Sequence, residues 1–200
     1  MIDANGFITA GGRSSRMGQD KAWLQLGGRA MIEHVIAALA PVTGVTIIAN
    51  SPEYLRLGLP VVADDNSGVG PLEAIRTAMS HATTSRVILV GCDLPFVTSE
   101  LFKRLLSIAG SDSATVPIGA DGNLEPLCAI YRREALPVVT KLISEGKRKV
   151  SLLFDRVPTR FVGFDELLDL ENSELFFENV NTPDDYDRAA QKLLKHGRID

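Results

Sequence analysis

The sequence is poor in the residues that build disulfide frameworks and metal centres. Its only two cysteines, Cys92 and Cys128, lie far apart and share no metal-ligand spacing. This excludes a disulfide framework and a zinc site, and it favours a reducing compartment. The three histidines are isolated, and His34 lies in a helical pattern where a packing or surface role outweighs a catalytic one.

Long apolar runs and an excess of positive charge are also missing. The longest apolar runs have only the length of a strand, so no segment is predicted to span a membrane. The N-terminus carries no charged leader followed by an apolar region, as a secretion signal would. A formal net charge of −4 argues against a general nucleic-acid or membrane-surface binder. We therefore expect a cytoplasmic protein with neither kind of partner.

What the sequence does contain favours an α/β fold. Its 200 residues, 45% hydrophobic and 23% charged, suffice for one domain, residues 1–200, with a real core. Short β-branched runs alternate with segments of helical period, which predicts a mostly parallel central sheet with helices on both faces. The expected strands cover 6–10, 45–50, 60–64, 86–93, 113–118, 126–131 and 160–164, and the expected helices cover 31–39, 71–79, 98–108, 134–145 and 183–196.

The first expected strand runs into a glycine-rich, basic stretch, FITAGGRSSRMGQDKAW, residues 7–23. Glycines let backbone N–H groups approach an anion, and Arg16 and Lys21 are side chains suited to phosphate oxygens. The spacing fits neither a P-loop nor the dinucleotide fingerprint, because Gly11 and Gly12 are adjacent. An anion site is favoured here over a merely solvated basic loop.

Carboxylates follow two other expected strands. Asp65 comes after the strand at 60–64, and Asp93 ends the strand at 86–93. Open α/β sheets bind ligands at the carboxyl ends of their strands. A lone aspartate there often caps a turn, but two of them beside a basic loop indicate a magnesium–nucleoside triphosphate site.

Five segments resemble a known family: AGGRSSRMGQDK at 10–21, GPLEAI at 70–75, CDLPF at 92–96, EPLCAIY at 125–131 and NVNTPDDY at 179–186. The first is similar to the signature loop of nucleotidyltransferases with a Rossmann-like domain, and it is shared by cytidylyl- and sugar-transferring relatives. The combination with the late NVNTP resembles the molybdenum cofactor guanylyltransferases, which join GMP from GTP to molybdopterin.

The resemblance implies a nucleotide half of the site, made by Thr9, Ala10, Gly11, Gly12, Lys21, Asn50, Asp65 and Asp93. Arg16 would stabilise charge on the α-phosphate or the leaving pyrophosphate, and it would act with Lys21 and Asp93 as a catalytic residue. Asp93 would also hold Mg²⁺. Two positions depart from the family pattern: Thr9 replaces the usual leucine, and Asn50 is displaced from the asparagine that reads guanine.

An acceptor half is implied by four other residues. Asn179 and Asn181 would lie near the metal on the pterin-phosphate side, and Arg148 or Lys149 would reach the anionic cofactor. Each pair also has a purely structural interpretation, because basic residues complement helix ends and asparagines are common in turns.

The implied reaction is attack of the molybdopterin phosphate on the α-phosphorus of GTP, in which positioning and charge stabilisation suffice without a general base. Transient contact with proteins that deliver or accept the cofactor is a further expectation. Two alternatives stay open at this point. One is a relative that uses CTP on molybdopterin or a nucleotide on a sugar phosphate. The other is a non-catalytic nucleotide-binding module.

Overall fold

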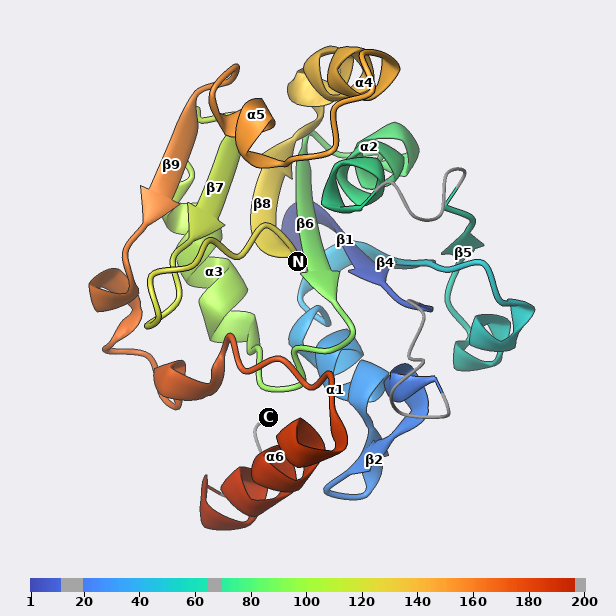
Figure 1. Ribbon diagram of the computed structural model, residues 1–200, viewed down its shortest axis with the longest axis vertical. Helices are drawn as coiled ribbons and strands as arrows, with labels where there is room; N and C mark the ends of the chain where they lie inside the picture. The colour runs from blue at the N-terminus through green and yellow to red at the C-terminus, as the bar shows by residue number, and fades with distance from the viewer. Residues whose placement is uncertain (12–19, 65–69, 197–200) are drawn as a thin grey trace.

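The computed structural model describes residues 1–11, 20–64 and 70–196. A seven-stranded sheet lies at its centre, with the order β5-β4-β1-β6-β8-β7-β9 (Figure 1). Only β8 runs antiparallel to its neighbours β6 and β7, and the other pairs are parallel, so the predicted mostly parallel sheet is confirmed. The strands are β1 Ile2–Thr9, β4 Val42–Ile48, β5 Val61–Val62, β6 Arg86–Gly91, β7 Ala114–Pro117, β8 Cys128–Arg132 and β9 Thr159–Val162.

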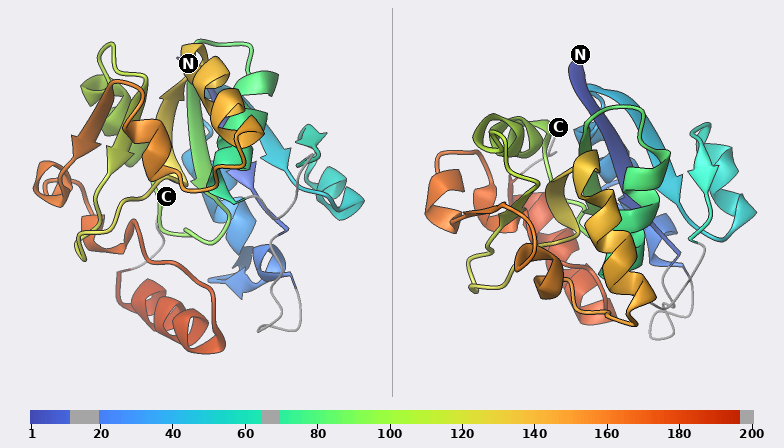
Figure 2. Two further views of the ribbon diagram at one scale, coloured as in Figure 1. Left: turned by 45° about the horizontal axis from the view of Figure 1, so that its top comes forward. Right: turned by 90° about the horizontal axis from the view of Figure 1, so that it is seen from above.

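Helices cover both faces of this sheet, as the alternation of elements predicts. Side chains of β1 and β6 alternate between two buried clusters: Ile8 and Ile88 belong to one, and Phe7 and Leu89 to the other. The first cluster packs against α1 and α3, and the second against α2, α4 and α5, with α2 and α4 lying side by side (Figure 2). These helices are α1 Met31–Ala38, α2 Pro71–His81, α3 Ser99–Ile108, α4 Leu136–Ser144 and α5 Ser151–Phe154.

Two helix starts follow the rules that predict them. Pro71 occupies the first turn of α2, where its missing N–H costs no hydrogen bond. The Thr98 hydroxyl accepts a hydrogen bond from the Leu101 N–H at 3.3 Å and so caps α3. Both helices therefore begin near the carboxyl ends of the strands that precede them.

Several short elements were not predicted. A hairpin of two-residue strands, β2 Gln25–Leu26 and β3 Arg29–Ala30, follows the basic stretch, and the last helix, α6 Pro183–His196, packs against it (Figure 1). The Tyr186 hydroxyl of α6 donates a hydrogen bond to the Gln25 carbonyl. The helix expected at 134–145 is divided into a 3₁₀ turn and α4. That turn is η3 Arg133–Ala135, and the other 3₁₀ turns of the described residues are η1 Lys21–Trp23, η2 Pro52–Leu57, η4 Phe164–Leu167 and η5 Ser173–Leu175.

The strand order brings the functional segments to one edge. From β1 the chain moves outward to β4 and β5, then returns through α2 to β6 on the other side of β1. The carboxyl ends of β1, β4, β5 and β6 therefore meet where the strand order reverses, which is where open α/β sheets bind ligands. Within the described residues, no helix is both long and apolar enough to cross a membrane.

Candidate active site

The end of β1 is held between its two neighbours. The Ala10 N–H donates to the Ile48 carbonyl at 2.9 Å, and the Cys92 N–H donates to the Thr9 carbonyl at 3.0 Å. The next residue, Gly11, has a φ of +82°, which a side chain would strain. The chain thus leaves the sheet in a fixed direction, with its backbone at the wall of a cavity.

That cavity has a volume of about 850 Å³ and opens at the carboxyl edge of the sheet. It is lined by residues from seven segments, most of them at or near strand ends: Thr9, Ala10, Gly11, Lys21, Ala49, Asn50, Asp64, Gly70, Pro71, Ala74, Cys92, Asp93 and Leu127. A volume of this size is ordinary for a small-molecule site. Six of the predicted nucleotide-side residues are therefore gathered in one wall.

Lys21 joins three segments that are far apart in the sequence. Its Nζ donates to Asp93 Oδ2 at 2.6 Å and to Asn181 Oδ1 at 2.7 Å. The lysine and aspartate side chains are 16% and 21% exposed, so the pair is shielded from water but open to the cavity. The predicted catalytic residues Lys21 and Asp93 thus meet, and they meet the predicted acceptor-side residue Asn181.

Asp93 is fixed by a close approach to the backbone. A Cβ built on Gly91 would lie 2.3 Å from Asp93 Oδ1, so the carboxylate occupies space that only glycine leaves free. The Asp93 carbonyl accepts a hydrogen bond from the Val180 N–H at 2.9 Å. This bond places the chain at 179–181 beside the end of β6.

Asn50 lies in the cavity wall at the end of β4. Its Oδ1 accepts a hydrogen bond from the Asp64 N–H at 3.0 Å, which ties the ends of β4 and β5 together. Asn50 is displaced in the sequence from the position of the family's asparagine, but it still lines the cavity. Its carbonyl oxygen is engaged, and among the described residues its amide NH₂ has no hydrogen-bond partner.

Burial shapes the acid–base properties around the cavity. Burial chiefly raises the pKa of the Cys92 thiol, and the charge of Asp93 adds to this effect, so the thiol stays protonated. Glu125, which precedes β8, has its pKa raised to about 7 by burial and by the charges of Asp121 and Asp93. Glu125 was not predicted as a site residue, although it lies in the quoted segment EPLCAIY.

A family comparison adds to this geometry. The family model of the MobA-like NTP transferase domain matches residues 6–158, which hold the end of β1, Lys21 and Asp93. The chain belongs to the MobA-like NTP transferase family. The resemblance predicted from the signature loop is thereby confirmed.

Named relatives agree with this assignment. The chain is 40% identical to the "Probable molybdenum cofactor guanylyltransferase" of Carboxydothermus hydrogenoformans, over 94% of this chain and 93% of the relative. It is 33% identical to the "Molybdenum cofactor guanylyltransferase" of Vibrio cholerae, over 98% and 93%. A solved structure, "Molybdopterin-guanine dinucleotide biosynthesis protein A" from Archaeoglobus fulgidus, superposes with a TM-score of 0.81 at 24% identity, covering 96% of this chain and 99% of the other. At that identity the superposition shows the fold alone.

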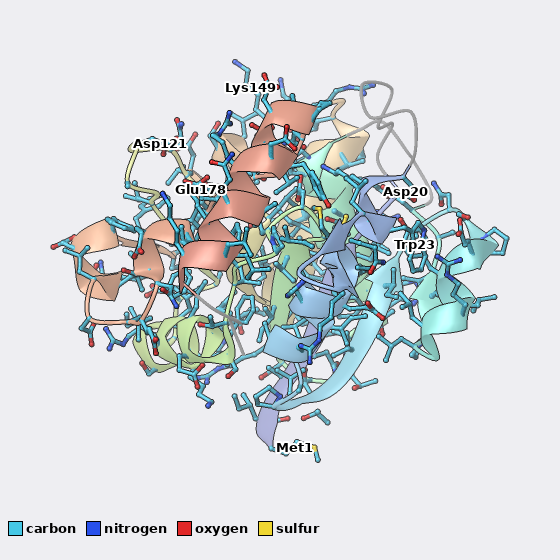
Figure 3. The ribbon with its side chains drawn as sticks, turned by 90° about the horizontal axis from the view of Figure 1, so that it is seen from below. Met1, Asp20, Trp23, Asp121, Lys149 and Glu178 are labelled. Carbon is cyan, nitrogen blue, oxygen red and sulfur yellow. The ribbon has the colours of Figure 1, made fainter. Side chains whose placement is uncertain are left out.

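Three further predicted residues of this MobA-like domain lie apart from Lys21 in the described part of the chain. The Asn179 side chain is exposed and its Nδ2 donates to the Phe177 carbonyl at 3.4 Å. Arg148 and Lys149 are exposed on the segment between α4 and α5. Figure 3 shows Lys149 at the end of the molecule away from Met1. The predicted residues Gly12, Arg16 and Asp65 lie outside the described residues.

The oxygens around Lys21 are of the chemical kind that a divalent metal binds. Asp93 Oδ2 and Asn181 Oδ1 come from separate segments and converge on one cationic group, the lysine Nζ. Mg²⁺ takes oxygen ligands and is usually held by one or two carboxylates together with substrate phosphates. In the described part of the chain, no group of three or more His, Cys, Asp or Glu side chains could hold a metal. A site shared with substrate phosphates is the arrangement that Asp93 and Asn181 can supply.

Two supporting residues were missed by sequence reasoning. Asp20 caps η1 through its Oδ1, which accepts from the Ala22 N–H at 3.1 Å, and its Oδ2 accepts from the Tyr54 hydroxyl at 2.6 Å. The DK pair of the signature loop gave a signal for Asp20. Nothing in the sequence pattern indicated Tyr54, because it lies 34 residues away on another turn.

Proposed function

We propose that this protein transfers GMP from GTP to Mo-molybdopterin, forming the guanine dinucleotide form of the cofactor and releasing pyrophosphate. The observation that supports this most is the meeting of Lys21, Asp93 and Asn181 at one cavity of a MobA-like domain. Relatives that are 33% and 40% identical over nearly the whole chain are named molybdenum cofactor guanylyltransferases, which supports GTP as the nucleotide and the molybdenum cofactor as the acceptor.

In the proposed reaction, a terminal phosphate oxygen of the acceptor forms a bond to the α-phosphorus of GTP. The bond from that phosphorus to the bridging oxygen breaks, and the electron pair leaves with pyrophosphate. Because the nucleophile is already an anion, no proton has to be removed. The work of the protein is therefore positioning and charge stabilisation.

Residues of the chain divide this work between them. The backbone at Gly11 would offer its N–H group at the cavity wall, and the Lys21 ammonium would neutralise phosphate charge. Asp93 and Asn181 would hold Mg²⁺, which supplies positive charge to the phosphate oxygens when bound. Asn50, which lines the cavity at the end of β4, would contact the base.

The identity of the nucleotide can be tested by binding alone. The only tryptophan, Trp23, lies two residues after Lys21 and stacks on Tyr54 with ring centroids 5.1 Å apart. We expect GTP–Mg²⁺ to change the Trp23 emission and to raise the unfolding temperature, and CTP–Mg²⁺ to do neither at equal concentration. A response to CTP alone would favour the cytidylyl alternative.

The chemistry needs its own test. Pyrophosphate release should require GTP and Mo-molybdopterin together, and Asp93→Ala should lower its rate by about 10²–10³. Binding of GTP without pyrophosphate release when the acceptor is supplied would favour a non-catalytic module. A cytoplasmic location and transient contact with cofactor-carrying proteins stay predictions of the sequence.

A further inference from the structure

Asp20 uses both of its carboxylate oxygens, and each engages a different segment. Oδ1 accepts from the Ala22 N–H at 3.1 Å, which fixes η1, the turn that begins with Lys21. Oδ2 accepts from the Tyr54 hydroxyl at 2.6 Å. The carboxylate therefore links the turn that carries Lys21 to a residue 34 positions later.

Tyr54 is a rigid partner for this link. It is fully buried on η2, which follows Asn50 and is capped by the Ser51 side chain. Burial, together with the hydrogen bond to Asp20, raises the pKa of the phenol well above its ordinary value, so the hydroxyl keeps its proton and stays a donor. A hydrogen bond to a charged acceptor is stronger than one between neutral groups.

Aromatic packing joins the same two turns. Trp23 of η1 stacks on Tyr54 of η2 with an angle of 28° between the rings, and the Arg56 guanidinium lies 3.6 Å from the centre of the Trp23 ring. Figure 3 shows Asp20 and Trp23 close together, at the right of the view. The η1 and η2 turns are thus held by a charged hydrogen bond, a ring stack and a cation–π contact.

We propose that Tyr54 is a positioning residue for nucleotidyl transfer. Its hydroxyl fixes Asp20, Asp20 fixes η1, and η1 places the Lys21 ammonium 2.6 Å from Asp93. The segment that follows Asn50, on the base side of the cavity, thereby sets the position of the phosphate-binding group. This inference rests on the proposed function, in which Lys21 contacts the phosphates.

A purely structural role for Tyr54 predicts a different result from a role through Lys21. Loss of a buried hydroxyl lowers stability wherever it occurs. If Tyr54 acts through Lys21, its substitution should lower kcat when Lys21 is present and should have no effect on kcat when Lys21 is absent. Non-additivity of the two substitutions in kcat separates these cases.

The experiment compares Tyr54→Phe, Lys21→Ala and the double variant in GMP transfer to Mo-molybdopterin. We expect Tyr54→Phe to lower kcat by about tenfold, the effect of losing one hydrogen bond to a charged group. In the Lys21→Ala background, Tyr54→Phe should have no further effect on kcat, although it should still lower the unfolding temperature. Tyr131→Phe is the matched control, because its equally buried hydroxyl donates to the Pro126 carbonyl at 2.8 Å and not to Asp20.

A second variant distinguishes loss of the charged contact from a general loss of structure. Asp20→Asn keeps an oxygen for the Ala22 N–H but removes the charge that the Tyr54 hydroxyl contacts, and its effect on kcat should vanish in the same way without Lys21. Unchanged Trp23 emission in either variant shows that the local packing is intact. The inference would be overturned if the fold losses in kcat of the single variants multiplied in the double variants. A Tyr54→Phe protein with wild-type kcat would overturn it too. An inactive wild-type protein would instead overturn the proposed function.

Discussion

Replacement of Lys21 by alanine tests the centre of the site. The substitution removes the ammonium that contacts Asp93 Oδ2 at 2.6 Å and Asn181 Oδ1 at 2.7 Å. If this ammonium stabilises charge that develops on the phosphates, its loss should lower kcat by about 10²–10³. That range is typical for removal of one preorganised donor, and it corresponds to about 2.7–4 kcal/mol of transition-state stabilisation.

The same substitution should lower the stability without unfolding the protein. The paired side chains are 16% and 21% exposed, so the contact is stronger than a surface ion pair and weaker than a fully buried one. We expect a loss of about 1.5–3 kcal/mol, the contribution of a hydrogen bond to a charged group. For a chain of this length, that loss lowers the unfolding temperature by about 3–12 °C. The variant therefore stays folded at assay temperature.

A surface ion pair of equal length provides the control. Lys192 Nζ contacts Glu178 Oε1 at 2.6 Å, and these side chains are 33% and 38% exposed. Lys192→Ala should cost about 0.2–1 kcal/mol and leave the rate unchanged. Pyrophosphate release at saturating substrates gives kcat, and circular dichroism gives the unfolding temperature. A folded Lys21→Ala protein with near-normal kcat, or an equal rate loss in Lys192→Ala, would refute the reasoning.

Two further substitutions test local geometry and charge. Gly91→Ala should displace the Asp93 carboxylate, which lies 2.3 Å from the new Cβ, and lower kcat by about 10²-fold. Gly44→Ala in β4 is the control, because the nearest atom to its Cβ would be 3.7 Å away, and equal activity of the two variants would contradict the role of the close approach. Burial and the charges of Asp121 and Asp93 raise the pKa of Glu125 from 4.5 to about 7. Because the folded state favours the protonated carboxyl, the stability that this group contributes below about pH 4.5 is lost as the pH rises through 7. Glu125→Gln should therefore raise the unfolding temperature relative to wild type at pH 8 but not at pH 4.5, and a difference independent of pH would contradict the shift.

Much of the sheet could be predicted because its signals are local. The apolar run of β6, Arg86–Gly91, has the length and composition of a strand covered on both faces, and Pro71 and Thr98 mark helix starts. The hairpin of β2 and β3 has strands of only two residues, which are too short to show a period. The hairpin packs against both α1 and α6, which are distant contacts that no local pattern shows.

The site was predicted by residue type rather than by contact. The motifs pointed to Lys21, Asp93 and Asn181 separately, but the ammonium joins residues 72 and 160 positions away, and no local pattern encodes such distances. Tyr54 gave no signal, since its role depends on a buried hydroxyl that reaches Asp20 from another turn. The raised pKa of Glu125 likewise depends on burial and on charges that the fold brings near.

The central claim is that this MobA-like domain transfers GMP to a pterin phosphate. The most direct measurement incubates the purified protein with Mo-molybdopterin, Mg²⁺ and each nucleoside triphosphate in turn, and identifies the products by mass spectrometry. The account predicts a guanine dinucleotide product and pyrophosphate with GTP, and no conjugate with CTP, ATP or UTP. A cytosine conjugate, or no conjugate with any nucleotide, would contradict it.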